Sequence, residues 1–233
     1  MGRVMEPLHA PKRKPWTQWT APVALATLVG GAIAFASLHF LRPDLDPSAH
    51  FGSEYALGPH GWIMELVFLL FATGLFALGA GLLGMLPPRK RLAIAGAGLF
   101  FFASPAFVVS AIFPTDPLGA PATAAGTIHN TFGLLIFLSI PAGAVLVTAA
   151  VWREQPWRSG RPILAALAVA SVLAFLAFPT LAAMGLAGLA QRIALSVYIP
   201  WLISFAAQLQ RSVARDLGVA LTAATDGTSG ART

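Results

Sequence analysis

The chain has 233 residues, of which 57% are hydrophobic and only 10% are charged. Soluble domains carry about 25% charged residues, so this composition excludes a soluble protein and indicates an integral membrane protein. Basic residues outnumber acidic ones by 15 to 9, but they form short clusters between apolar segments, which excludes a nucleic-acid partner. The chain contains no cysteine, which excludes disulfides, thiolate ligands and iron–sulfur clusters.

Six apolar runs follow one another along the chain, each long enough at about 20 residues to cross a bilayer as a helix. They cover residues 20–41, 62–86, 92–113, 123–151, 163–186 and 193–209. None has the alternating pattern of a barrel strand, and in hydrocarbon a helix satisfies its own backbone groups. The sequence therefore predicts an all-α bundle of six transmembrane helices over residues 20–210. A basic N-terminal segment (1–19) precedes the bundle, and a disordered tail (211–233) follows it.

The basic residues predict how this bundle is oriented. They gather in the N-terminal segment, in the second and fourth connections, and in the tail, as Arg3, Lys12, Arg13, Lys14, Arg89, Lys90, Arg91, Arg153, Arg158, Arg161, Arg211 and Arg215. Cytoplasmic loops carry an excess of Lys and Arg. We therefore expect both termini on the cytoplasmic side of a bacterial-type inner membrane, with the first, third and fifth connections outside.

The first outer connection, residues 42–61, is the longest loop. Asp46 followed by Pro47 is typical of a helix start, and Gly58-Pro59 is typical of a helix stop. The pattern predicts a short helix over residues 47–57, lying across the outer face of the bundle. On such a helix His50, Ser53 and Glu54 would share one side.

Ionisable side chains are rare in the six runs, and all lie near their outer ends. They are His39, Glu65, His129 and Arg192, and the outer loops add Asp44, Asp46, His50, Glu54, His60 and Asp116. An ion-coupled transporter usually keeps a carboxylate or a broken-helix ion site near the bilayer midplane. The distribution argues against a transporter and favours a pocket that is open on one side only.

We take this outer-facing pocket as the main hypothesis. Its candidate lining residues are Glu65, Asp116, His129 and Arg192, with Ser53 and Glu54 contributed by the lid helix. Such a pocket would bind a lipid headgroup or a small polar ligand. The same residues also allow a structural interpretation. Glu65 and Arg192 can form an ion pair, His129 can hydrogen-bond to Asp116 or Glu65, and Asp116 can shape a turn.

Two cofactors are compatible with the outer residue types. Zinc takes His nitrogen and carboxylate oxygen, and His39, His50, His129 and Asp116 are its candidate ligands. A zinc site would make the protein a metal-dependent lipid hydrolase, although the chain has no HExxH motif. A haem between His39 and His129 is less favoured, because no His pair lies at matched depth. The remaining alternative is an accessory subunit of a membrane complex, bound to a membrane protein partner.

Three blocks of sequence resemble a known family. They are Ser53-Glu-Tyr-Ala-Leu-Gly-Pro-His-Gly-Trp62, then Phe113-Pro-Thr-Asp116 with Gly126-Thr-Ile-His129, and then Gly188-Leu-Ala-Gln-Arg192. Together they resemble a prokaryotic six-span membrane family that is catalogued as a domain of unknown function, number nine hundred and ninety-eight. The resemblance implies the six-helix fold and the importance of Ser53, Gly58, Asp116, His129 and Arg192. It implies no reaction, and this chain has Gln191 where an acidic residue is expected.

Overall fold

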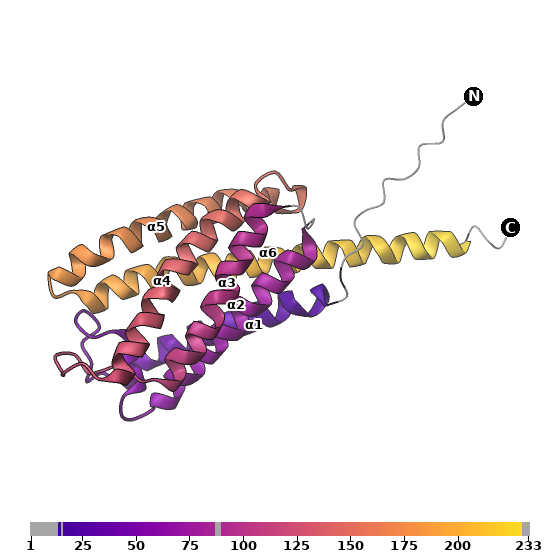
Figure 1. The fold of residues 1–233 in the computed structure, drawn as a ribbon. Coiled ribbons are helices and arrows are strands. Elements are labelled where there is room, and N and C mark those ends of the chain that lie inside the picture. Colours follow the sequence, from indigo (N-terminus) through magenta and orange to yellow (C-terminus); the bar gives the residue numbers. More distant parts are fainter. Residues whose placement is uncertain (1–13, 15, 87–89, 230–233) are drawn as a thin grey trace.

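The computed structural model describes residue 14, residues 16–86 and residues 90–229, and every regular element in this part of the chain is a helix. Six long helices are α1 (Thr17–Leu41), α2 (Gly61–Met85), α3 (Arg91–Ile112), α4 (Ala124–Val151), α5 (Arg161–Ala183) and α6 (Ala187–Ser229) (Figure 1). Two short 3-10 helices are η1 (Gly52–Ala56) and η2 (Gln155–Gly160). Six helices are long and apolar enough to cross a membrane, which confirms the predicted fold.

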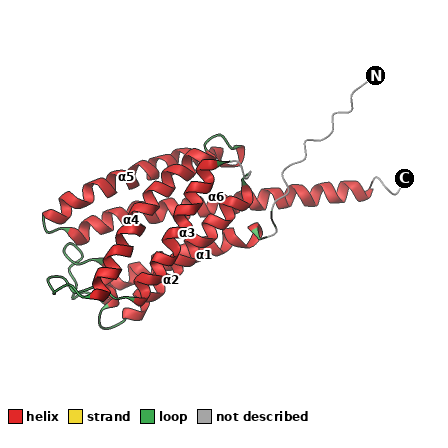
Figure 2. Cartoon of the chain, viewed as in Figure 1, coloured by secondary structure: helices red, strands yellow, loops and turns green. Residues whose placement is uncertain are grey.

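The six helices form a closed ring. Each helix packs against the next one along the chain, and α6 closes the ring by packing against α1. The loops gather at the two ends of the bundle (Figure 2). The seam between α4 and α5 is the most sparsely packed of the six. Openings between helices are therefore most readily found along this seam.

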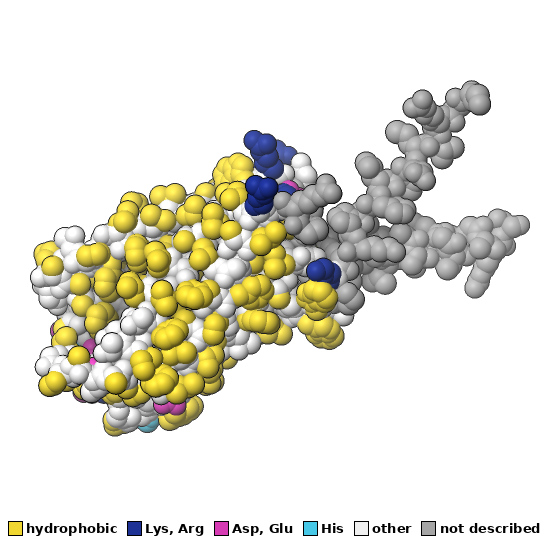
Figure 3. Space-filling model, viewed as in Figure 1, with side chains coloured by type: hydrophobic (Ala, Val, Ile, Leu, Met, Phe, Trp, Pro, Cys, Tyr) yellow, Lys and Arg dark blue, Asp and Glu magenta, His cyan; other side chains and the backbone are white. Residues whose placement is uncertain are grey.

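The outside of the ring is suited to lipid. Large apolar side chains point outward from the helices, including Ile33, Phe76, Leu134, Leu173 and Leu176, each more than half exposed. Figure 3 shows a body covered with hydrophobic side chains. Exposed apolar surface on this scale is found where a protein contacts a membrane, so the chain is a multi-pass membrane protein.

The two ends of the bundle carry opposite charge. Lys and Arg side chains gather at the end where α6 extends beyond the other helices, and Asp and Glu lie mostly at the opposite end (Figure 3). We call these the basic end and the acidic end. The acidic end contains the loops 42–60, 113–123 and 184–186. Of the basic residues that predict orientation, Arg3, Lys12, Arg13 and Arg89 lie outside the described residues.

Two segments differ from the sequence prediction. The expected helix over residues 47–57 is instead a turn followed by the 3-10 helix Gly52–Ala56. The Asp46 carboxylate accepts hydrogen bonds from the backbone and hydroxyl of Ser48, and the Asp46 carbonyl accepts from the His50 backbone, so the chain turns locally before a helix can propagate. At the other end, α6 continues as a helix to Ser229, where the sequence predicts a disordered tail from residue 211.

Close helix contact depends on glycine at several positions. At Gly143 on α4, an added Cβ would lie 2.6 Å from the ring of Phe100, which is fully buried on α3. At Gly98 on α3, the same atom would meet nothing within 4 Å. Small residues allow membrane helices to approach closely where a larger side chain would keep them apart.

We predict that Gly143→Ala lowers the free energy of unfolding in detergent by about 1–3 kcal/mol, because the new methyl group overpacks the Phe100 ring. Gly98→Ala is the matched control. It makes the same substitution in a helix without the overlap and should leave stability unchanged or raise it by about 0.4–1 kcal/mol. Equal effects of the two variants would contradict the close α3–α4 approach.

Candidate functional site

Arg192, in the first turns of α6, is the centre of the polar contacts at the acidic end. Its guanidinium donates to His39 Nε2 at 3.0 Å, to the His50 carbonyl at 2.8 Å and to the Tyr55 hydroxyl at 3.0 Å. It also donates to the Gly188 carbonyl one turn earlier, at 3.1 Å. One side chain thus joins α1, the 42–60 loop and α6.

These contacts fix the protonation state of His39. A guanidinium can only donate, so His39 Nε2 must accept and must carry no proton. The proton is then on Nδ1, which lies 3.2 Å from the Phe35 carbonyl and donates to it. His39 is therefore a neutral structural residue with both ring nitrogens engaged, and its Nε2 lone pair is not free for a metal.

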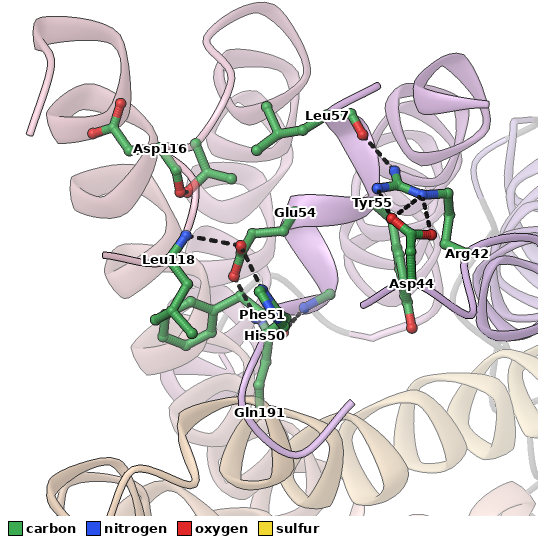
Figure 4. A network of polar contacts seen from close by, with 12 residues as sticks. Arg42, Asp44, His50, Phe51, Glu54, Tyr55, Leu57, Asp116, Leu118 and Gln191 are labelled. Atoms are coloured by element: carbon green, nitrogen blue, oxygen red, sulfur yellow. Dashed lines mark hydrogen bonds and ion pairs between the residues drawn. The ribbon is translucent and has the colours of Figure 1, made fainter. Parts of the chain in front are cut away.

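Glu54 connects two loops of the acidic end. Although its side chain is only 3% exposed, its carboxylate accepts from the backbone amides of Phe51 and Leu118 at 2.9 and 3.0 Å. His50 Nδ1 donates to the same carboxylate at 2.9 Å. Figure 4 shows these contacts converging on Glu54 between the 42–60 loop and the 113–123 loop. A buried carboxylate with three donors is well satisfied, so Glu54 holds the two loops together.

The start of α6 packs tightly against the 42–60 loop. Gln191 Oε1 accepts from the Gly52 amide at 2.5 Å. At Gly188 an added Cβ would overlap the backbone carbonyl of His50. Glycine at position 188 is thus needed for the loop to reach Arg192.

Asp116 stabilises the start of α4. Its carboxylate accepts from the Thr123 backbone amide at 3.0 Å and from the Thr123 hydroxyl at 2.7 Å. Thr123 is the N-cap of α4, and its hydroxyl oxygen accepts from the Gly126 amide at 3.0 Å. The two hydrogen bonds from Thr123, led by the backbone one, hold the pKa of Asp116 below its ordinary value of 3.8.

His129 connects α4 to the end of α3. Its Nδ1 donates to the carbonyl of Phe113 at 2.8 Å, one of the carbonyls that the end of a helix leaves without an intrahelical partner. In a neutral imidazole the other nitrogen, Nε2, is then an acceptor. His129 also lines two adjoining cavities. One side chain therefore makes a structural hydrogen bond and contributes to the cavity wall.

The predicted pocket residues are therefore distributed over separate contacts. Arg192 bonds to His39 and Tyr55, Asp116 to Thr123, and Glu54 to the backbone of both loops. Glu65 is exposed on α2 and has no hydrogen bond or ion pair within the described part of the chain, so the Glu65–Arg192 pair of the structural interpretation is not formed. Ser53 and His129 are the candidates that the structure brings to one cavity.

The candidate zinc ligands are also apart. Across residues 16–86 and 90–229, no group of three His, Asp or Glu side chains lies close enough to hold a metal ion. The four candidates His39, His50, His129 and Asp116 each bond to a different partner. The described donors thus offer no zinc site.

A cleft opens between α4 and α5 near the acidic end. Its volume is about 290 Å³, and four of its ten lining residues are phenylalanines, Phe51, Phe137, Phe175 and Phe178. It shares Ser53, His129, Gly133, Phe137 and Gln191 with a smaller inner cavity of about 70 Å³ that reaches into the centre of the ring. Asn130 and Leu134 on α4 are exposed at its edge, so the cleft opens sideways, toward the membrane.

The polar groups of the cleft lie at its acidic end and have spare hydrogen-bonding capacity. Gln191 uses its oxygen on Gly52, and its amide nitrogen has no hydrogen bond to any described residue. The Ser53 hydroxyl likewise has none in the described chain. In the inner cavity, the Ser110 hydroxyl is buried without a partner among the described residues. Buried polar groups are nearly always paired, so these groups are suited to a ligand.

A family model described as "Protein of unknown function (DUF998)" matches residues 12–208, a region that contains the first five candidate membrane spans and most of the sixth, which runs over Ala187–Arg215. The chain belongs to this family. No curated protein and no solved structure matches the chain. In this DUF998 protein the first and third blocks that resemble the family meet at the acidic end through the Arg192–Tyr55 contact. The two parts of the second block are joined at the same end by the His129–Phe113 contact.

Several residues of this end are not singled out by the sequence. Tyr55 and Gly188 lie inside the three blocks, so their place there is a signal that could identify them. Asn130 and three of the four cleft phenylalanines, Phe137, Phe175 and Phe178, lie in apolar runs. A phenylalanine in such a run has the same sequence pattern whether it lines a cavity or faces lipid.

We predict that Arg192→Lys lowers the free energy of unfolding in detergent by about 1–3 kcal/mol, because one ammonium cannot reach the four acceptors that the planar guanidinium joins. Arg158→Lys is the control, since Arg158 is exposed at the basic end. It should change stability by less than about 0.5 kcal/mol. If both variants unfold at the same denaturant concentration, Arg192 does not hold the acidic end together.

We also predict a pH dependence from Asp116. Because its pKa is lowered in the folded protein, its contribution to stability is present above the ordinary pKa. That contribution is lost as the pH falls through the folded pKa. Asp116→Asn should therefore unfold at a lower temperature than the parent protein at pH 7, and the difference should shrink toward pH 3. If the difference in unfolding temperature is the same at pH 7 and pH 3, an ionised Asp116 does not stabilise the start of α4.

Proposed function

We propose that this DUF998 protein binds a membrane lipid in the cleft between α4 and α5, with the lipid headgroup at the acidic end of the cleft. The observation that carries this proposal is the composition of the cleft. Its walls are mostly aromatic and apolar, while Ser53, Asn130, His129 and Gln191 place polar groups among them. This combination fits an amphipathic ligand, because a purely polar ligand would leave the phenylalanines exposed to water.

The position of the cleft supports entry from the membrane. It lies on the most sparsely packed seam of the ring, and its edge residues Asn130 and Leu134 are exposed on the outside of α4. His129 is about one and a half turns into α4, just below the level of the loops. A lipid could therefore slide in along the seam while its headgroup stays close to the membrane surface.

The chemistry of the polar end favours an uncharged headgroup. No Lys, Arg, Asp or Glu lines the cleft, and the nearby Arg192 already bonds to four acceptors. His129 Nε2 would accept a hydrogen bond, and the Gln191 amide nitrogen would donate one. A headgroup rich in hydroxyl groups can meet both needs, since a hydroxyl donates and accepts.

We also infer the orientation of the protein in its membrane. Lys and Arg gather at the basic end (Figure 3), and an excess of these residues marks the cytoplasmic side. This supports a bacterial-type inner membrane protein with both termini cytoplasmic. The cleft would then open into the outer leaflet.

The proposal can be tested by filling the cleft. Gly133 lines both cavities, and an added Cβ there would meet nothing within 4 Å. The leucine side chain of Gly133→Leu should occupy the space of the ligand, and its Cβ has room there. We expect it to lower the amount of lipid that stays bound through purification, measured by native mass spectrometry, by at least about tenfold, the loss that corresponds to 1.4 kcal/mol.

Gly98→Leu is the matched control. Gly98 also lies in a helix with nothing within 4 Å of an added Cβ, but it lines neither cavity. This variant should retain lipid as the parent protein does. Equal lipid retention by Gly133→Leu and Gly98→Leu would overturn the proposed function.

A further inference from the structure

A second, larger groove lies at the basic end, on the same α4–α5 seam. Its volume is about 770 Å³, within the range of ligand sites. It is bordered by the start of α3, the last turns of α4 and the first half of α5. Small side chains at Ala149, Ala165 and Ala168 leave the space between α4 and α5 open.

The rim of this groove is cationic. Lys90, Arg91 and Arg153 all line it. Glu154 pairs with Lys90 and is the acidic partner seen at this rim. Arg91 and Arg153 are exposed, and neither has a hydrogen bond or ion pair to the part of the chain that the structure describes. Two guanidinium groups beside an open groove are therefore available to an anion.

The groove also extends into the depth of the membrane. On α4 it is lined from Ala150 back to Val145, a distance of about 8 Å along a helix that rises 1.5 Å per residue, and Trp152 and Arg153 line it just beyond the end of that helix. Its deep part is apolar, with Val145 and Val169 among its lining residues. Trp152, at the level of the arginines, is half-exposed, and tryptophan is typical of the membrane–water interface.

We propose that this groove is a binding site for an acidic phospholipid. The phosphate of the lipid lies between Arg91 and Arg153, and the first part of an acyl chain lies along Val145 and Val169. A soluble anion would use the arginines but leave the apolar depth of the groove empty, whereas a zwitterionic lipid would bring its own cation next to Arg91 and Arg153. Basic pockets between membrane helices are suited to anionic headgroups.

This site differs from the proposed cleft in its residues and in its ligand. The two openings have no lining residue in common. The cleft lacks Lys and Arg, while the groove has three such residues. The acidic-phospholipid site therefore does not depend on the proposed function, and it can exist whether or not the cleft binds a lipid.

The test is a titration of the delipidated full-length protein with phosphatidylglycerol and with phosphatidylcholine of the same acyl chains, followed by native mass spectrometry. We expect the first phosphatidylglycerol to bind at least about tenfold more tightly, since each basic residue near the headgroup contributes about fivefold. Repeating the titration with Gly133→Leu, whose cleft is filled, separates this groove from the cleft. If Gly133→Leu loses the preference for phosphatidylglycerol, this lipid binds in the cleft, and the proposed site in the groove is wrong.

Arg153→Gln and Arg158→Gln form a matched pair. Both remove one exposed arginine at the basic end, but Arg153 lines the groove and Arg158 does not. Arg153→Gln should weaken phosphatidylglycerol binding about fivefold, and Arg158→Gln less than about twofold. Ala149→Phe, which fills the groove without changing its charge, should weaken it as well.

Three further results would overturn the proposal. The first is equal affinity of the parent protein for the two lipids. The second is an equal loss in Arg153→Gln and Arg158→Gln, which would indicate attraction to the general charge of the basic end. The third is full binding by Ala149→Phe, which would place the lipid outside the groove.

Discussion

The acidic end of this protein depends on the guanidinium of Arg192. Four of its hydrogen bonds end on α1, on the 42–60 loop and on α6 itself, and a planar group with five donors is suited to join acceptors that lie in different directions. The His50 and Tyr55 contacts hold the 42–60 loop over the ring. With the loop in this position, Gly52 reaches Gln191 and Glu54 reaches Leu118.

The hydrogen bonds of Arg192 also determine the position of the polar end of the cleft. Ser53 lies between Gly52 and Glu54, which are both fixed by hydrogen bonds to other elements. Gln191 is next to Arg192 on α6 and lines the cleft. Much of the polar chemistry at the acidic end is thus structural. The groups left open to a ligand are neutral, which is why the cleft is suited to a lipid with an uncharged headgroup and not to a metal ion or a free anion.

Both proposed binding sites lie on the α4–α5 seam of the ring. Elsewhere, glycines bring helices into close contact, as Gly143 does with Phe100. The centre of the seam is supported by Trp201, whose indole N–H donates to the Leu164 carbonyl on α5 at 3.1 Å and to the Thr148 hydroxyl on α4 at 3.3 Å. The seam opens toward each end, with a neutral cleft at the acidic end and a cationic groove at the basic end.

The sequence predicts the six helices well, because a run of about 20 apolar residues has few other stable arrangements in a membrane. It also predicts that polar side chains gather at one end. It does not reveal that the side chains of Arg192 and Asp116 make structural hydrogen bonds to other parts of the protein. A polar residue looks the same in a sequence whether its role is structural or functional. The helix expected at residues 47–57 is interrupted because the Asp46 side chain turns back on Ser48, a local competition that the helix-start pattern does not show.

The role of Arg192 and the occupancy of the cleft are tested most directly by a crystal structure of the protein grown in a lipid mesophase. We expect the Arg192 guanidinium to contact the His50 carbonyl and the Tyr55 hydroxyl. We also expect elongated lipid density in the α4–α5 cleft, with its polar end at His129. A structure in which Arg192 pairs with Glu65, or in which Phe175 and Phe178 close the cleft against α4, would contradict these expectations.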